Sequence, residues 1–209
     1  MIHVTPHPEP NDFDHLVRQP GLFFLSKRPN PTTDDFKNHD YWTRIIPQMR
    51  VAYGQICAYC CEYIPYLTGN RQVEHFWPKS EPPHTRAYDW NNYRLVCGII
   101  NGRKGVKTIL DPFYVEDGWF AIQFPSLQIV PGKIGGLSAT LVKKIEDTIT
   151  VLKLNDEGEN IPAREWHLDV YCEHGNFQHL MLTAPFLAKE LTRQNLQQEI
   201  KKMRSQRSI

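Results

Sequence analysis

Residues that could carry out acid–base chemistry lie together at 73–80, where the sequence reads VEHFWPKS. Glu74 directly precedes His75, and Lys79 follows four residues later. An imidazole has the side-chain pKa best suited to accepting a proton near neutral pH, and a carboxylate is a ligand for hard cations. Adjacent residues on a strand point to opposite faces, so this pair needs a local bend to act at one point. The alternative is a salt-bridged acid beside a solvated histidine.

A second group of polar residues follows in the stretch YDWNNYRLVCGIINGRKG at 88–105. Asn92 lies five residues before Cys97, and Asn101 and Lys104 follow that cysteine by four and seven residues. Amide oxygens suit Mg²⁺ or Mn²⁺, with waters completing the coordination shell. Residues 101 and 104 are one helical turn apart and would share a helix face. Carboxylate, imidazole, amide and ammonium groups together could bind a divalent cation and transfer a proton.

Three of the five cysteines have a spacing that suggests a metal site. Cys57 and Cys60 are separated by the two-residue gap that suits tetrahedral zinc, and Cys97 is the next candidate ligand. A second two-residue gap would need a cysteine at position 100, but Ile100 stands there. Buried thiols that act as small apolar side chains are therefore favoured over a complete zinc site. If zinc is bound, these three cysteines are the expected ligands, with a fourth that the sequence does not identify.

Composition limits the classes of function. The 209 residues are 41% hydrophobic and carry a net charge of +1. No apolar run is long enough for a membrane span, and the first residues lack the pattern of a secretory signal, so we expect a cytoplasmic protein that does not contact a membrane. A protein that holds nucleic acid by charge alone is usually far more basic. A nucleic-acid substrate would therefore be held weakly, by a local patch, or with the help of a partner.

The elements that would position these residues predict an α+β fold. We expect an N-terminal arm and helices over 1–56, comprising a proline-rich extended arm to residue 32 and then a helix that Thr33 caps and Pro47 interrupts. The core would occupy 57–115. The remaining 116–209 should form short strands and helices packed on the core as one domain.

Within the chain, 106–110, 118–124 and 127–132 look like short strands. Apolar residues recur at helical spacing over 140–155 and again over 184–206. The apolar side of this last helix raises a further hypothesis, that it docks another chain, although packing on its own core is the simpler expectation.

The order of these motifs resembles that of the HNH endonucleases, whose ββα-metal core is a two-stranded hairpin followed by a helix that together hold one divalent cation. The resemblance rests on the Cys-x-x-Cys pair, the acid–histidine pair, an Asn five residues before a Cys, and the Asn-x-x-Lys at 101–104. Further likeness in VEHFWPKS, YDWNNYRLVC, LDPF and DTITVLKLN, over roughly residues 57 to 164, is to the small HNH proteins of Septu and Septu-linked retron antiphage systems.

The resemblance implies a role for each residue. His75 would be the general base and Asn92 the residue that braces the loop and keeps the histidine oriented. Glu74 and Asn101 would hold one Mg²⁺ or Mn²⁺, and Lys104 would reach a phosphate. Lys79 is a second candidate for a phosphate contact.

For the whole protein, the resemblance implies a metal-dependent endonuclease with helical N- and C-terminal flanks around its core. It would hydrolyse phosphodiester bonds of DNA rather than RNA, in antiviral defence, beside an ABC-type ATPase. The alternative is a catalytically degenerate HNH scaffold that binds nucleic acid or another protein. The absent cysteine at position 100 favours this alternative.

Overall fold

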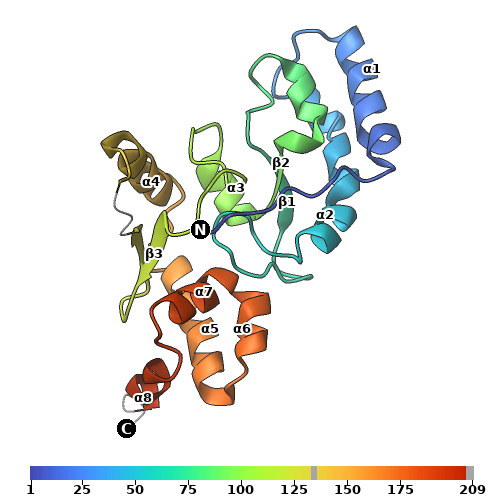
Figure 1. Cartoon of the computed structure of the whole chain (residues 1–209). Helices are drawn as coiled ribbons and strands as arrows, with labels where there is room; N and C mark the ends of the chain where they lie inside the picture. The colour runs from blue at the N-terminus through green and yellow to red at the C-terminus, as the bar shows by residue number, and fades with distance from the viewer. Residues whose placement is uncertain (133–135, 206–209) are drawn as a thin grey trace. The chain divides into compact units, whose positions relative to one another are not determined.

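The computed structural model describes residues 1–132 and 136–205 and shows a mixed α+β protein with two small antiparallel hairpins (Figure 1). The chain forms two compact units. The first comprises Met1–Val4, Tyr59–Tyr63 and Ile109–Ile209, and the second Thr5–Ala58 and Ile64–Thr108. These boundaries differ from the predicted segments 1–56, 57–115 and 116–209. The α+β class is confirmed.

The second unit is built on a hairpin followed directly by a helix. Strand β1 (Arg71–His75) pairs antiparallel with β2 (Tyr93–Cys97), with His75 opposite Tyr93, and α3 (Gly98–Lys104) begins at the next residue. Between the strands, residues 76–92 include two 3₁₀ turns, η4 (His84–Tyr88) and η5 (Trp90–Asn92). β2 is almost entirely buried, as expected for a run rich in β-branched and aromatic residues.

The prediction of an extended arm over 1–32 agrees with the structure over residues 1–10, which form no helix or strand, and is wrong for residues 13–27, which are helical. A π-helical turn, η1 (Asp14–Arg18), runs into α1 (Gln19–Lys27). Pro20 is the second residue of α1 and follows the π-helical turn without a break in the helix. The helical segment therefore begins before the proline.

The long helix predicted from Thr33 is also absent. The segment instead forms two 3₁₀ turns, η2 (Asp35–Asn38) and η3 (Tyr41–Ile45), followed by α2 (Ile46–Ala52). The Thr32 backbone N–H and hydroxyl both donate to the Asp35 carboxylate, which stabilises a local turn in place of a regular helix. Pro47 lies in the first turn of α2, so it restarts the helix.

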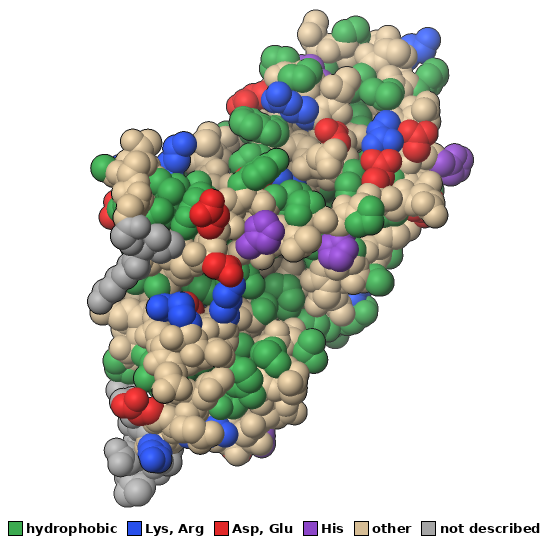
Figure 2. Space-filling model, viewed as in Figure 1, with side chains coloured by type: hydrophobic (Ala, Val, Ile, Leu, Met, Phe, Trp, Pro, Cys, Tyr) green, Lys and Arg blue, Asp and Glu red, His purple; other side chains and the backbone are tan. Residues whose placement is uncertain are grey.

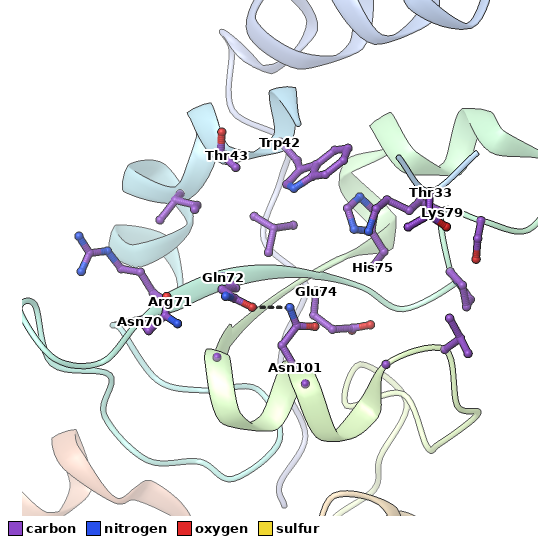
Figure 3. A pocket seen from close by; sticks show the side chains of 18 residues that line it. Thr33, Trp42, Thr43, Asn70, Arg71, Gln72, Glu74, His75, Lys79 and Asn101 are labelled. Atoms are coloured by element: carbon purple, nitrogen blue, oxygen red, sulfur yellow. Dashed lines mark hydrogen bonds between the residues drawn. The ribbon is translucent and has the colours of Figure 1, made fainter. Parts of the chain in front are cut away.

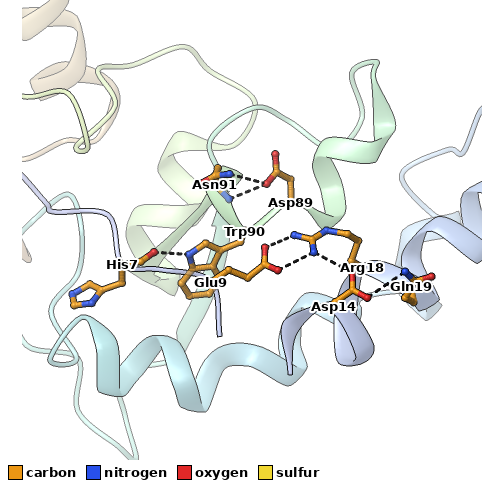
Figure 4. A network of polar contacts seen from close by, with 8 residues as sticks. All are labelled: His7, Glu9, Asp14, Arg18, Gln19, Asp89, Trp90 and Asn91. Atoms are coloured by element: carbon orange, nitrogen blue, oxygen red, sulfur yellow. Dashed lines mark hydrogen bonds and ion pairs between the residues drawn. The ribbon is translucent and has the colours of Figure 1, made fainter. Parts of the chain in front are cut away.

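The N-terminal segment of this unit is fastened to the end of the hairpin (Figure 4). The Trp90 indole N–H donates to the His7 carbonyl at 2.8 Å. Arg18 pairs with Glu9 and, at 3.1 Å, with Asp14. The η1–α1 region therefore belongs to the same packed body as β1, β2 and α3.

The first unit contains the second hairpin and most of the α-helix. Strands β3 (Phe120–Gln123) and β4 (Gln128–Pro131) lie within two of the predicted strand segments, whereas 106–110 forms no strand. The helices are α4 (Ala139–Val151), α5 (Asn160–His174), α6 (Phe177–Thr183), α7 (Pro185–Arg193) and α8 (Glu199–Ser205). The helix predicted over 184–206 is thus two helices, and residue 206 lies outside the described residues.

Side chains hydrogen-bond to the backbone on both outer edges of this second hairpin, at the paired residues Ile122 and Ile129. Glu190 of α7 accepts from the Ile122 N–H at 2.9 Å, and Gln194 donates to the Ile122 carbonyl at 2.7 Å. Across the sheet, Ile129 is the partner of Ile122, and its N–H and carbonyl bond to the Asn155 side chain at 2.7 and 2.8 Å. Backbone groups that a third strand would satisfy are satisfied by side chains.

Charges of both signs are interspersed with apolar side chains on the face shown in Figure 2. This distribution agrees with the near-neutral net charge. No helix in the described part of the chain combines the length and the apolar character needed to cross a bilayer.

Candidate active site

A cavity of about 740 Å³ lies in the second unit, and all residues of β1 line it (Figure 3). β1 pairs with one strand only in the described residues, so its other edge has no strand beside it. The side chains lining the cavity that matter for chemistry are Trp42, Gln72, Glu74, His75, Lys79 and Asn101. Four of the predicted site residues are therefore brought together.

His75 is held in one tautomer. Its Nε2 lies 3.0 Å from the Ala87 carbonyl oxygen, which can only accept, so Nε2 carries the proton and Nδ1 keeps a lone pair. The ring is buried between Trp42 and Tyr93, with edge-to-face centroid distances of 4.6 and 5.2 Å. Burial, together with the positive charge of Lys79, lowers the pKa of His75 to about 3. The imidazole is therefore neutral at neutral pH, and its hydrogen bond to Ala87 fixes its orientation.

Asn92 braces the loop that anchors this histidine. Its side-chain oxygen accepts from the Trp77 N–H at 2.7 Å, and its amide donates to the carbonyls of Trp77 and Arg86, both at 2.9 Å. Arg86 is the neighbour of Ala87, whose carbonyl bonds to His75. Asn92 therefore ties the segment at Trp77 to the segment at Arg86.

Glu74 forms a buried ion pair with Lys104. The Lys104 Nζ lies 2.6 Å from Glu74 Oε1, and both side chains are almost inaccessible to solvent. The same ammonium donates to the carbonyls of His75 and Phe76 at 3.2 and 3.1 Å. The predicted phosphate contact of Lys104 is therefore not what the structure shows, because the ammonium is 0% exposed and its hydrogen bonds are made inside the protein.

Asn101 lies at the first helix after β2, as predicted, and is oriented by a residue that the sequence motifs did not suggest. Its Nδ2 donates to Gln72 Oε1 at 2.6 Å. The amide oxygen therefore turns away from Gln72, and in Figure 3 it lies on the side of Glu74. Gln72 precedes Glu74 by two residues on β1, so strand periodicity alone places them on one face. That spacing is the signal that could have identified Gln72.

The predicted local bend between Glu74 and His75 is absent. β1 stays in regular register through both residues, with Glu74 opposite Arg94 and His75 opposite Tyr93. Their side chains therefore leave opposite faces of the strand, and both still line the one cavity. A substrate lying across the free edge of β1 would meet the imidazole on one side and the carboxylate and amide on the other.

Lys79 is the lysine that the structure places in the cavity. Its ammonium lies 5.4 Å from the Trp42 ring centroid. Burial lowers the pKa of Lys79, and the nearby Glu74 carboxylate opposes that shift. Trp42, which contacts both this lysine and His75, was not identified from the sequence, because a single tryptophan within a 3₁₀ turn carries no motif.

The three cysteines Cys57, Cys60 and Cys97 come together. Their sulfur atoms all lie within 4.8 Å of one another, so the group could hold a metal ion. None of the five cysteines, all of which are in the described ranges, forms a disulfide. Ile100 is buried and supplies no ligand atom.

Comparison with known proteins adds no assignment. No protein-family model matches the chain, and a search of curated proteins finds no match.

Proposed function

We propose that this protein is a metal-dependent phosphodiester hydrolase, an HNH-type endonuclease whose ββα-metal core is β1, β2 and α3. The observation that carries the proposal is the state of His75. A neutral imidazole with one nitrogen committed to a backbone carbonyl and the other holding a lone pair lines the same cavity as a carboxylate and an amide. That combination suits removal of a proton from water next to a phosphodiester.

Glu74 and Asn101 are the proposed ligands of one Mg²⁺ or Mn²⁺. The fit rests on donor chemistry: a carboxylate and an amide oxygen are hard donors, and Figure 3 shows them side by side. When bound, such a cation would neutralise charge that develops on the phosphoryl oxygens. A cation at Glu74 would share the carboxylate with Lys104.

The other residues orient the reacting groups and supply positive charge for a phosphate. His75 accepts the proton of the attacking water at Nδ1 while its Nε2–H stays bonded to Ala87, so the ring does not turn. Asn92 keeps the anchoring loop in place. Lys79 supplies the positive charge that a phosphate in the cavity would meet.

DNA is the proposed substrate, and antiphage defence beside an ABC-type ATPase the proposed setting. Both follow from the resemblance to the small HNH proteins of Septu and retron systems. The net charge of +1 supports a partner that delivers the substrate, because a near-neutral nuclease gains little from general attraction to phosphates.

The test is DNA cleavage with Mg²⁺ or Mn²⁺ by the purified chain, alone and with its co-purified partner. His75→Gln, which keeps a donor for the Ala87 carbonyl, should slow cleavage about 10²- to 10⁴-fold while thermal unfolding stays close to wild type. The matched control is His174→Gln, whose side chain is 62% exposed in the first unit. Wild-type cleavage by a folded His75→Gln variant would remove His75 from its role.

One observation favours the scaffold alternative. Glu74 is already ion-paired and 2% exposed, as a carboxylate that serves only stability would be. Titration with Mn²⁺ separates the two proposals. A nuclease binds the ion and loses it in Asn101→Ala but not in the surface control Asn91→Ala, whereas a scaffold binds none in either.

A further inference from the structure

An exposed aromatic ring flanked by two guanidinium groups lies in the second unit, just before β1. The Tyr66 side chain is 64% exposed. The Arg50 guanidinium lies 3.4 Å from its ring centroid, and that of Arg71 lies 5.7 Å from it. Arg71 also donates to the Tyr66 carbonyl at 2.7 Å, which fixes the loop against the first residue of β1.

Neither guanidinium has its charge neutralised by an acid. Arg50 donates to the neutral side chain of Gln55, and Arg71 to a backbone carbonyl. In the described ranges no carboxylate pairs with either arginine. Two cations and an exposed aromatic ring are the components of a surface that holds phosphates and stacks a base.

This ring is connected to the candidate active site through Arg71. Arg71 lines the cavity that contains His75, while Tyr66 and Arg50 line a second hollow of about 430 Å³ with Pro47. Figure 3 shows the Arg71 guanidinium at the end of the cavity opposite Lys79. Positive side chains therefore mark both ends of a path that passes His75.

We propose that Tyr66, with Arg50 and Arg71, stacks an unpaired nucleobase a few nucleotides from the scissile phosphate, so that the substrate is single-stranded DNA. The inference rests on the proposed nuclease function and names its substrate class. In a duplex the faces of each base are covered by its neighbours, and an aromatic side chain can stack only on a base that has left the helix.

The length of β1 limits which base is involved. Arg71 precedes His75 by four residues, or about 13 Å of strand. At the 3.4 Å rise of a stacked strand this corresponds to about four base steps. The base that meets Tyr66 should therefore lie within about four nucleotides of the cleaved bond.

Binding without cleavage tests the proposal. The probe is a fluorescent 12-nucleotide single strand of DNA, compared with a blunt duplex of the same sequence, in EDTA. Wild type should bind the single strand more tightly. Tyr66→Ala should weaken single-strand binding by about 5- to 100-fold, as expected for the loss of one stacked base, and Tyr66→Trp should retain it. Duplex binding should not change.

The matched control is Phe23→Ala. Phe23 is 68% exposed on α1 and has the Lys27 ammonium 5.5 Å from its ring, but it lines neither hollow. It should bind the single strand like wild type. An abasic nucleotide within four positions of the cleaved bond should weaken wild-type binding and leave Tyr66→Ala unchanged.

The inference is overturned if Tyr66→Ala and wild type bind the single strand with equal affinity. It is also overturned if wild type binds the duplex as tightly as the single strand, or if Phe23→Ala weakens single-strand binding as much as Tyr66→Ala does. The proposed function fails separately. If Tyr66-dependent binding occurs and no metal-dependent cleavage follows, the nuclease proposal falls alone. If cleavage depends on His75 and binding does not depend on Tyr66, only the base-stacking proposal falls.

Discussion

Lys104 and Glu74 form an ion pair inside the protein, with Nζ 2.6 Å from Oε1 and neither side chain reaching solvent. The ammonium comes from the last residue of α3 and the carboxylate from β1, so one contact joins the helix to the hairpin. Because the same ammonium also donates to the carbonyls of His75 and Phe76, it fixes the backbone on which both proposed catalytic side chains stand. Lys104 is thus a positioning residue for Glu74 and His75.

Removing one member of this pair should be costly. Lys104→Met removes the ammonium that pairs with the buried Glu74 carboxylate and should lower the free energy of unfolding by about 3–5 kcal/mol, measured by urea denaturation. The double variant Glu74→Gln/Lys104→Met should cost less than the sum of the two single changes, because the interaction between the two groups is then lost only once. Lys143→Met removes an exposed pair with Asp147 and should cost less than about 1 kcal/mol. Additive single and double changes would contradict the pairing.

The neutral His75 predicts a pH dependence of stability in metal-free protein. Its pKa falls from 6.5 to about 3 on folding, so between these pH values the unfolded chain binds the proton and the folded chain does not. The free energy of unfolding should therefore fall by about 1.4 kcal/mol per pH unit as the pH drops below about 6.5. Above about pH 6.5, His75 should make no contribution to the pH dependence. Urea denaturation of wild type and His75→Gln between pH 4.5 and 7.5 measures the difference. Parallel curves would show that His75 is protonated in the folded state.

Loss of the brace at Asn92 should affect both stability and activity. Asn92→Ala removes three side-chain hydrogen bonds and leaves the Trp77 N–H without its acceptor, so we expect a loss on the order of 2–4 kcal/mol. Asn91→Ala is the matched control, since Asn91 is exposed and its side chain donates to the Asp89 carboxylate. Where the Asn92→Ala protein is still folded, cleavage should be slower because Ala87 no longer holds His75. Equal stability of the two variants would show that the loop needs no brace.

The cysteine cluster predicts bound zinc. Thiolates within 4.8 Å of one another bring ligands to one point at little cost in chain entropy, so the purified protein should contain up to one zinc ion per chain, measured by elemental analysis. Cys97→Ser should lose it and Cys172→Ser, outside the cluster, should keep it. Zinc-free wild type, purified without chelator, would mean that the three thiols serve as buried apolar side chains.

Sequence reasoning located the hairpin and the site because their signals are local. The residues Arg-Gln-Val before Glu74 read as a strand, and β1 ends at His75 as expected. α4 followed from apolar residues at helical spacing. The opposite orientation of the Glu74 and His75 side chains also followed from strand periodicity. The local bend expected between these two residues is absent. Both side chains nevertheless line the same cavity beside β1.

The features that were missed depend on side-chain contacts that carry no motif in the sequence. α1 has a proline as its second residue and was read as part of an extended arm. The helix expected after Thr33 was replaced by 3₁₀ turns held by one carboxylate. The burial of Lys104 could not be predicted from its motif, because the spacing that suggests a phosphate contact is also the spacing that brings its ammonium beneath β1.

The hairpin of β3 and β4 has a consequence for solubility at high concentration. A two-stranded sheet offers two rows of backbone groups to any other strand, and such edges seed association between molecules. Here the side chains of Glu190 and Gln194 hydrogen-bond to the backbone of Ile122 on one edge, and the side chain of Asn155 hydrogen-bonds to that of Ile129 on the other. The hairpin is therefore protected on both sides from strand addition, and Asn155→Ala should open one side to self-association without touching the proposed active site.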